Sequence, residues 1–493
     1  MRKQHQRQLL ALLKTCEEAQ DHGLYADCQD AALAMVEFIE EQEGKGTHTA
    51  EVLKEYYRLL YRVYNGEIDK SPLYQQLRMI EACIKTELKP TKFKALFLPY
   101  YDNTWESMKS VYEAFSRDPL FETEVVITPI IRNTNEGPKF VWQDYLTPVG
   151  IPNTRYDRYS VEFDRPDVVF YNQPYDGVNI PKYRSRNIRQ YADCMVYIPY
   201  GVKKPIPIQG AQNTFGKFTS VQLCDIFIAQ SETFRQHNLT GTLFQKALVT
   251  GHPKWDCLYA AKRNGEYVRY SEWETAIGGR RVILLNTHYT YMIDGVDLHP
   301  GVKRLIDRVD ENEDLFLIWR PHPQAFLMKM SASMKAMLRI ANMHERMLVD
   351  CTPSMTSAFA YAHAVVSLFP STIIMDALFL DLPVFVLGRD DFIKNPSGCL
   401  TNPFYTALLH EDFTHHPPDR NADPWMVQNY IENSIYAPLD AFIEEVKNGE
   451  DSKREARAAF RKQEFPNSDG TVAQTILQIV KERLWRDAAK PLM

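Results

Sequence analysis

Three runs of apolar residues near the N-terminus repeat at intervals of three and four. They cover residues 9–16, 31–39 and 52–63. This spacing places apolar side chains along one face of a helix. Gly44 and Gly46 separate two of the runs and supply a turn. The pattern predicts a small helical domain over residues 1–88, which we interpret as a packing or dimerisation module without chemistry.

From residue 94 onward the pattern changes to short, continuous apolar runs. They predict strands at residues 95–98, 124–131, 167–171, 195–199, 225–229 and 247–250. Polar loops and helical segments separate these runs, as in the strand–helix–strand units of a parallel sheet. We assign this group to an N-terminal Rossmann-like domain over residues 89–262.

A polar segment at residues 262–280, which contains three glycines, is interpreted as an interdomain linker. Beyond it the pattern predicts strands at 282–286, 315–319, 364–368 and 384–387, with helices at 301–309 and 328–342. These form a C-terminal Rossmann-like domain over residues 280–470, followed by a C-terminal helix at 471–493. Two such halves in succession predict an α/β fold with a cleft between the domains.

Composition and charge narrow the class of protein. The 493 residues suit two or three domains, and a net charge of −6 argues against a nucleic-acid partner. The eight cysteines are scattered without a Cys-x-x-Cys pair, so we expect neither a zinc ribbon nor a disulfide framework. With no secretory signal and no apolar run of bilayer length, we expect a cytoplasmic protein; peripheral contact with the inner face of the plasma membrane is left open.

The segment at residues 369–387 is the most informative part of the chain. A buried strand leads into a helix that begins near Ser371 and Thr372 and ends at Asp381. Hydroxyl and backbone N–H groups at a helix start bind anions, and this loop lies at the ligand-binding edge of an open α/β sheet. We interpret the loop as a phosphate or diphosphate cradle. An ordinary capped crossover helix is the alternative.

Arg320 and His322 stand in the sequence Arg-Pro-His-Pro, directly after the strand at 315–319. A guanidinium offers planar donors to phosphate oxygens, and an imidazole can donate to them or move protons. Pro323 helps to stiffen the turn. We expect Arg320 and His322 to lie beside Ser371, because carboxyl ends of neighbouring parallel strands share one edge. Satisfying local carbonyl groups is the structural alternative.

Two other histidines also follow predicted strands. His288 ends the first strand of the second domain and is a candidate phosphate ligand or catalytic base. His252 and Asp256 lie in the compact turn Gly-His-Pro-Lys-Trp-Asp after the last strand of the first domain. This turn also suits a hinge, and each histidine has a structural alternative.

Four residues at strand ends of the first domain are candidates for an acceptor cleft: Tyr200, Gly201, Asp102 and Gln173. A glycine at position 201 would let the backbone approach a ligand. The nearby basic residues between 182 and 204 are interpreted as a solvated face, with lipid headgroups or an anionic acceptor as the alternative. The chain has no P-loop and no Gly-x-Ser-x-Gly elbow, and we expect no metal site.

The order of these motifs resembles the CDP-glycerol glycerophosphotransferase family, the teichoic-acid primases and polymerases with a GT-B fold. The resemblance covers roughly residues 94–485. Its pieces are the Gly251-His252-Pro253-Lys254-Trp255-Asp256 turn, the strand at 282–287, Arg320-Pro321-His322-Pro323, Ser371-Thr372 through Asp376, and Asn467-Ser468-Asp469-Gly470.

The resemblance implies a GT-B-like fold of two Rossmann-like domains facing a cleft, preceded by the small helical domain. It implies transfer of glycerol phosphate, or a related polyol phosphate, from a CDP-linked donor to a hydroxyl of a cell-surface polymer or lipid-linked acceptor. No cofactor is implied. The second domain would bind the donor phosphates through Arg320, His322, Ser371 and Thr372, and the nucleotide through Asp376 and Pro323.

One departure from the family concerns the catalytic base. The family's His-Gly-Thr-Pro loop corresponds here to Pro-Tyr-Gly-Val, with Tyr200 in place of the histidine. A tyrosine with a pKa of about 10 is a poor base at neutral pH. The base would then be a histidine (His288, His252 or His322) or Asp102. The alternatives are a GT-B glycosyltransferase or epimerase that uses a nucleotide sugar, or a non-catalytic GT-B-like scaffold in surface-polymer assembly.

Overall fold

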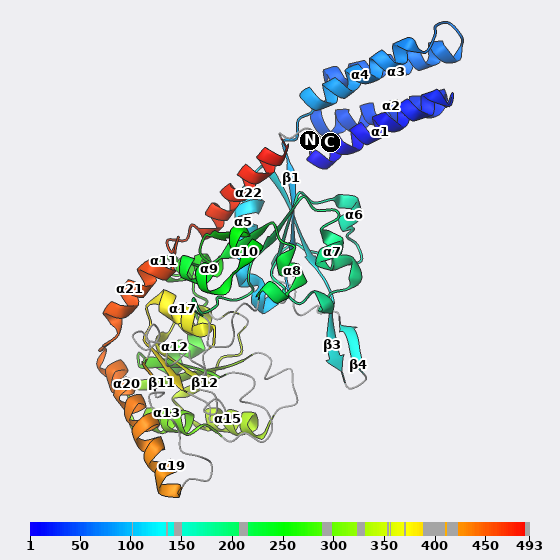
Figure 1. The fold of residues 1–493 in the computed structure, drawn as a ribbon. Helices are drawn as coiled ribbons and strands as arrows, with labels where there is room; N and C mark the ends of the chain where they lie inside the picture. The colour runs from blue at the N-terminus through cyan, green and yellow to red at the C-terminus, as the bar shows by residue number, and fades with distance from the viewer. Residues whose placement is uncertain are drawn as a thin grey trace.

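The computed structural model describes residues 1–100, 102–134, 137–141, 150–206, 215–287, 298–322, 331–352, 354, 356–368, 371–387, 410–411 and 423–488. In this part of the chain a helical bundle is followed by two domains, each built on a parallel sheet (Figure 1). This is the α/β arrangement that the hydrophobic pattern predicts, with the helical domain in front of it.

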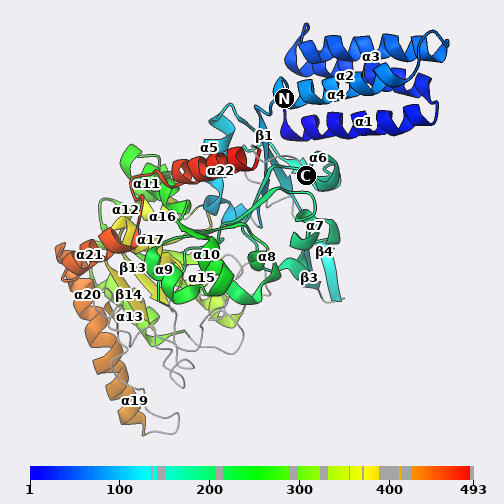
Figure 2. The ribbon, with the colours of Figure 1, turned by 45° about the horizontal axis from the view of Figure 1, so that its top comes forward.

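Four helices form the N-terminal bundle: α1 (Lys3–Asp21), α2 (Tyr25–Glu43), α3 (His48–Tyr64) and α4 (Ser71–Thr86). Their apolar faces meet in one core that includes Leu53, Tyr56 and Ile80, all fully buried. The bundle projects away from the sheets in both views (Figure 2). Ion pairs from Arg2 to Asp164 and from Lys3 to Asp193, both at 2.9 Å, attach α1 to the first domain.

The first sheet has seven parallel strands in the order β5-β2-β1-β6-β7-β8-β9. They are β1 (Phe93–Leu98), β2 (Phe121–Ile127), β5 (Thr154–Arg155), β6 (Val168–Tyr171), β7 (Cys194–Tyr197), β8 (Ile226–Ala229) and β9 (Ala247–Val249). Alternate residues along each strand face opposite sides. Phe97 therefore packs under α5 (Lys109–Arg117) and α22 (Val472–Ala488), while Leu96 packs on the other side, toward α9 (Glu232–Asn238) and α10 (Gly241–Lys246).

The predicted strand at 124–131 is divided in the structure. β2 ends at Ile127, and a separate antiparallel hairpin follows, made of β3 (Ile130–Thr134) and β4 (Gly137–Val141). Figure 1 shows this hairpin extending from the lower edge of the first domain. The apolar run crosses the break at residues 128–129, so its length alone could not reveal where the strand leaves the sheet.

The second sheet has six parallel strands in the order β12-β11-β10-β13-β14-β15. They are β10 (Arg281–Thr287), β11 (Leu315–Pro321), β12 (Met347–Val349), β13 (Ala362–Leu368), β14 (Val384–Leu387) and β15 (His410–Glu411). Helices α13 (Pro300–Glu311), α15 (Ala332–Met343) and α20 (Ala437–Asn448) cover one face. The other face packs against α17 (Ile373–Leu380) and α11 (Lys254–Asn264).

The polar segment at 262–280 is more than a linker. It contains α12 (Ser271–Ile277), whose Ile277 is buried in the core of the second domain. Trp273 of the same helix packs against Tyr361, with ring centroids 5.7 Å apart. Only two large apolar side chains of α12 face the core, so the helix looks polar in the sequence.

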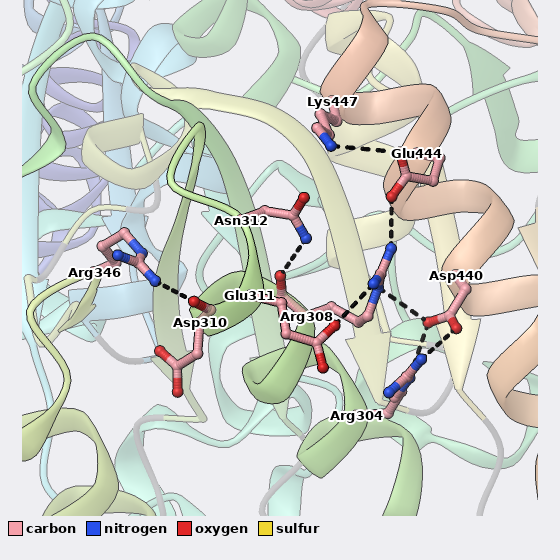
Figure 3. A network of polar contacts seen from close by, with 9 residues as sticks. All are labelled: Arg304, Arg308, Asp310, Glu311, Asn312, Arg346, Asp440, Glu444 and Lys447. Carbon is pink, nitrogen blue, oxygen red and sulfur yellow. Dashed lines mark hydrogen bonds and ion pairs between the residues drawn. The ribbon is translucent and has the colours of Figure 1, made fainter.

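A network of ion pairs joins α13 to α20 at the outer side of the second domain (Figure 3). Arg304 makes a two-pronged contact with Asp440, at 3.0 and 2.6 Å, and Arg308 pairs with Glu444 at 2.5 Å. Arg304 and Asp440 are both partly exposed. Water competes for such groups, so the network adds little stability compared with the apolar contacts beneath it.

The two domains share one apolar core at the junction of α11 and α17. Trp255 is fully buried, and its ring stacks on Phe379 at a centroid distance of 5.6 Å and an interplanar angle of 8°. Phe465 meets the same indole edge-on at 4.6 Å. After α21 (Arg454–Glu464) the chain returns to the first domain as α22. None of the helices in the described ranges has both the length and the hydrophobicity needed to span a bilayer.

Candidate functional site between the two sheets

The predicted phosphate loop opens helix α17. Thr372 occupies the N-cap position and is exposed, whereas every residue of the helix itself is buried. The hydroxyl of Ser371 accepts a bond from the amide of Ile373 at 3.3 Å, and the amide of Met375 donates to the carbonyl of Thr372 at 3.1 Å. The backbone amides of Ile373 and Met375 therefore donate to groups within this turn. Thr372 carries the exposed hydroxyl that the loop presents to an anion, because the single proton of the Ser371 hydroxyl is donated to Asn286 Oδ1.

Asn286 links this loop to the neighbouring strand end. It lies near the end of β10, between β11 and β13 in the sheet. Its amide nitrogen donates to the carbonyl of Arg320 at 3.2 Å, and its amide oxygen accepts from Ser371 Oγ at 3.0 Å. The two motifs expected side by side therefore meet through a residue that the sequence reasoning did not single out. The available signal was a polar side chain closing an apolar strand.

Arg320 is buried and already engaged. Its guanidinium contacts Asp350 Oδ2 at 2.5 Å and the carbonyl of Thr352 at 3.0 Å. Asp350 in turn accepts from the backbone amide of Thr352 at 2.8 Å, so Arg320 fixes the loop after β12. His322 is half-buried, and its amide donates to the carbonyl of Thr287 at 3.1 Å. The charge of Arg320 is thus balanced by Asp350, and its guanidinium braces this edge, whereas His322 is partly exposed there.

Two contacts join the edge of the first sheet to loops of the second domain. A Cβ at position 201 would lie 3.6 Å from Cγ2 of Thr372, so Gly201 and Thr372 face each other across the domains. Ser354, after β12, donates to the carboxylate of Glu106 at 2.6 Å. Glu106 belongs to a 3₁₀ helix after β1 (Asp102–Ser107), and no motif in the sequence marks it.

A buried ion pair crosses between the domains below these contacts. Lys254 Nζ lies 2.5 Å from Asp376 Oδ2, and the Asp376 side chain is fully buried. Burial works against the charged lysine, but the carboxylates of Asp376 and Glu106 raise its pKa above the ordinary value. Lys254 is therefore protonated at neutral pH. Asp376 was expected to contact the nucleotide; in the structure its carboxylate contacts this lysine.

The turn at residues 251–256 is engaged throughout with the fold. Gly251 has φ of 86°, and a Cβ there would lie 2.5 Å from the carbonyl oxygen of Pro466. Asp256 accepts from the amides of Val472 and Ala473 at 3.1 and 2.8 Å, which caps the start of α22. The turn is thus the structural junction between the domains and the C-terminal helix.

His252 belongs to the same junction. Its Nδ1 accepts from the amide of Lys254 at 3.2 Å, so Nε2 carries the proton and donates to the carbonyl of Pro199 at 2.8 Å. Burial lowers the pKa of His252 to about 3. Both ring nitrogens have backbone partners and the ring is buried, which favours a positioning role for His252 over proton transfer.

The remaining candidates occupy different places. Tyr200 is half-buried at the edge of the first sheet. Gln173 is buried and borders a cavity of about 20 Å³, space for about one water molecule and too small for a substrate. Asp102 begins a 3₁₀ helix, but its side chain lies outside the described residues, as do His288 and Pro323 entirely. Within the described ranges no three metal-ligating side chains gather.

Two Rossmann-like domains whose strand ends face each other, with a crossing back to the first domain at the C-terminus, form a GT-B-like fold. No protein-family model matches the chain. No curated protein matches it either.

Solved structures show the same architecture. The chain is similar to S. aureus MnaA in its structure with UDP, at 14% identity and a TM-score of 0.50, over 81% of this chain and 99% of that one. It also matches the wall teichoic acid polymerase TagF (14% identity, TM-score 0.49, 90% and 100% of the two chains). A third match is UDP-GlcNAc 2-epimerase from Neisseria meningitidis (13% identity, TM-score 0.46, 79% and 100%). At 14% identity, the match to MnaA describes the fold alone.

Proposed function

We propose that the chain is a transferase that moves glycerol phosphate, or a related polyol phosphate, from a CDP-linked donor to a hydroxyl group of a surface-polymer or lipid-linked acceptor. The observation that carries the proposal is the meeting of Ser371, Asn286 and the Arg320–His322 turn at one edge of the second sheet. That edge faces Gly201 of the first domain at van der Waals distance from Thr372. The order of motifs along the chain favours a CDP-linked donor.

In the proposed reaction the acceptor oxygen attacks the phosphorus of the polyol phosphate. A new P–O bond forms, the bond to CMP breaks, and the acceptor proton passes to a base. The Thr372 hydroxyl and His322 would bond to phosphate oxygens, and Ser371 would join them by turning its proton away from Asn286. Arg320, paired with Asp350, would hold the turn that carries His322. Domain closure would exclude water.

The base belongs to the proposal as well. With both ring nitrogens of His252 bonded to the backbone, His322 and His288 are the histidines left to accept the proton. His322 is half-buried at the edge where the phosphates would lie. His288 directly follows β10, next to Thr287.

A thermal-shift screen tests the donor. CDP-glycerol, CDP-ribitol, CMP, UDP and UDP-sugars are compared, because a ligand at about 100 times its Kd stabilises the folded state by about 2.7 kcal/mol. We expect the largest shift with a CDP-linked polyol, and release of CMP when an acceptor is supplied. A larger shift with UDP-sugars would favour a nucleotide-sugar enzyme. No shift with any nucleotide would contradict the proposal and favour a non-catalytic scaffold.

A further inference from the structure

Three tyrosines follow the ends of three adjacent strands in the first sheet. Tyr100 follows β1, Tyr175 follows β6, and Tyr200 follows β7, and these strands are neighbours in the order β1-β6-β7. Carboxyl ends of parallel strands share one edge, so the rings meet there. Tyr100 lies 6.2 Å from Tyr175 and 6.2 Å from Tyr200, between ring centroids. We call these three residues the tyrosine cluster.

Hydrogen bonds and a ring contact hold the tyrosine cluster in place, and its side chains remain partly exposed to solvent. The backbone amide of Tyr100 donates to Asn172 at 2.9 Å, and the Asn172 amide is itself anchored to Ser107 at 3.0 Å. Phe218 supports Tyr175 edge-on at 5.3 Å. Tyr175 is nevertheless 39% exposed, and the other two rings are half-buried. The three side chains are therefore held in position by the fold and remain partly exposed.

One cation lies in the cluster. Lys203 Nζ is 4.6 Å from the centroid of the Tyr200 ring. Gln230 clamps the lysine backbone, since its side chain bonds to both the amide and the carbonyl of Lys203 at 2.7 Å. Burial lowers the pKa of Lys203, and no carboxylate among the described residues offsets this effect. Lys203 is thus a positioned amine that a ligand oxygen could complement.

The cluster borders the proposed phosphate site. Tyr200 precedes Gly201, whose backbone lies against Thr372 at the start of α17. Burial and a hydrogen bond with Tyr200 raise the pKa of Tyr175 to about 12, so its hydroxyl stays protonated near neutral pH. An acceptor lying on the cluster would therefore meet hydroxyl groups and an amine within reach of the transferred phosphate.

We propose that Tyr100, Tyr175, Tyr200 and Lys203 form the acceptor subsite and that it binds a pyranose ring, so that the acceptor is a saccharide. A pyranose has an apolar C–H face that packs on phenol rings, and a rim of hydroxyls that bonds to phenolic oxygens and an amine. An isoprenoid chain would instead desolvate Lys203 and the hydroxyls without replacing their bonds. Glycerol phosphate has no ring face to stack. This inference rests on the proposed transfer function.

Saturation-transfer NMR tests the ligand class in the presence of the best-stabilising nucleotide. The probes are methyl glucopyranoside, methyl galactopyranoside and methyl N-acetylglucosaminide, compared with glycerol phosphate and geranyl phosphate. We expect strong transfer to pyranoside ring protons. Tyr175→Ala and Lys203→Met should each weaken pyranoside binding about tenfold, which corresponds to about 1.4 kcal/mol. Tyr61→Ala, at an exposed position on the bundle, is the matched control and should change nothing.

The outcomes separate the two proposals. If a nucleotide stabilises the protein but only glycerol phosphate or geranyl phosphate receives saturation, the saccharide subsite is wrong and the donor proposal stands. Pyranoside binding that survives both Tyr175→Ala and Lys203→Met would also overturn the subsite. Nucleotide-induced stabilisation of each variant shows that it is folded. If no nucleotide stabilises the wild type, the transfer function fails, whereas pyranoside binding lost in Tyr175→Ala would still support a saccharide site.

Discussion

Two loops leave the carboxyl edge of the first sheet and touch the second domain, but they differ in how far their side chains are engaged. In the turn at 251–256, Trp255 stacks on Phe379 and Lys254 pairs with Asp376. In the loop at 200–203, Tyr200 keeps part of its ring exposed. When a polar residue at the domain interface has its partners within the protein, as Lys254 has, it stabilises the fold. The groups left partly open are those available to a substrate.

Truncating Trp255 should have the largest effect on stability. Trp255→Ala removes a fully buried indole from the shared core, and we expect the free energy of unfolding to fall by about 4 kcal/mol. Urea denaturation measures the change. Trp425→Ala is the control, because Trp425 is 65% exposed and its loss should cost less than about 0.5 kcal/mol. Equal effects would mean that the turn does not join the domains.

The second-largest loss of stability is expected when one partner of the buried Lys254–Asp376 ion pair is removed. Lys254→Met leaves the Asp376 carboxylate buried without its cation and should cost about 3 kcal/mol. The double variant Lys254→Met/Asp376→Leu should recover most of this loss, because it also removes the stranded charge. If the double variant is as unstable as the single one, the pair is not the cause. Because Asp376 contacts Lys254 in the structure, we expect Asp376→Asn to leave nucleotide affinity unchanged; a loss of affinity would support the nucleotide contact that the family resemblance implies.

His252 should make stability depend on pH. Burial lowers its folded pKa to about 3, below the ordinary 6.5, so acid protonates the unfolded chain first and stability falls as the pH drops below 6.5. Between pH 7 and 5 this group should cost about 2 kcal/mol. Asp256 has the opposite sign, since burial raises its pKa to about 6 and favours the folded state on acidification.

Because His252 and Asp256 have opposite effects, the contribution of His252 is measured by comparing the pH dependence of stability in a His252 variant and in the wild type. His252→Gln should show a shallower loss of stability from pH 7 to 5 than the wild type, in chemical denaturation at each pH. His237→Gln, at an exposed position on α9, should keep the wild-type slope. An unchanged slope in His252→Gln would show that this ring takes up its proton as readily in the folded state as in the unfolded chain.

A smaller effect is expected on ligand binding at the open side of the interface. Ser371→Ala removes the hydroxyl that bonds to Asn286 and faces the proposed phosphates. We expect nucleotide-diphosphate affinity to fall about tenfold in calorimetry, in line with the loss of one hydrogen bond. Ser271→Ala, at an exposed position on α12, should bind normally. Full affinity in Ser371→Ala would remove this serine from the proposed donor site.

The smallest effect is expected far from the interface. Arg304→Ala breaks the partly exposed contact with Asp440 and should cost less than about 1 kcal/mol. High salt should reduce this difference further, since screening weakens the wild-type pair. A loss as large as that of Lys254→Met would mean that burial does not set the rank of these ion pairs.

Most strands of both sheets could be predicted because they are continuous, buried apolar runs, such as the residues of β11. Short or one-sided elements could not: β12 has three residues, and α12 buries little beyond Ile277. Within the candidate site, the motifs around Arg320 and Ser371 were visible as polar residues after apolar strands. The order of adjacent strands was not, so the sequence could not show that Asn286 bridges them.

The side-chain contacts between the two domains could not be predicted from the sequence for a different reason. Lys254 and Asp376 are 122 positions apart, and they meet only because α11 and α17 pack against each other. The same holds for Glu106 and Ser354. No local pattern encodes how one sheet is oriented toward another. A charged residue within an otherwise apolar helix, as Asp376 is, was the one available hint that a cation lies opposite.

The chain passes between the domains twice, outward through the turn at 251–256 before α11 and back between α21 and α22. The two passages lie together, because Asn467 of the second donates to the carbonyl of Thr250, just ahead of the first, at 2.9 Å. Any rotation of one domain must change backbone torsions in both passages at once, which permits bending about their common line and resists twisting across it. A protease that nicks either passage would leave the halves attached through the other.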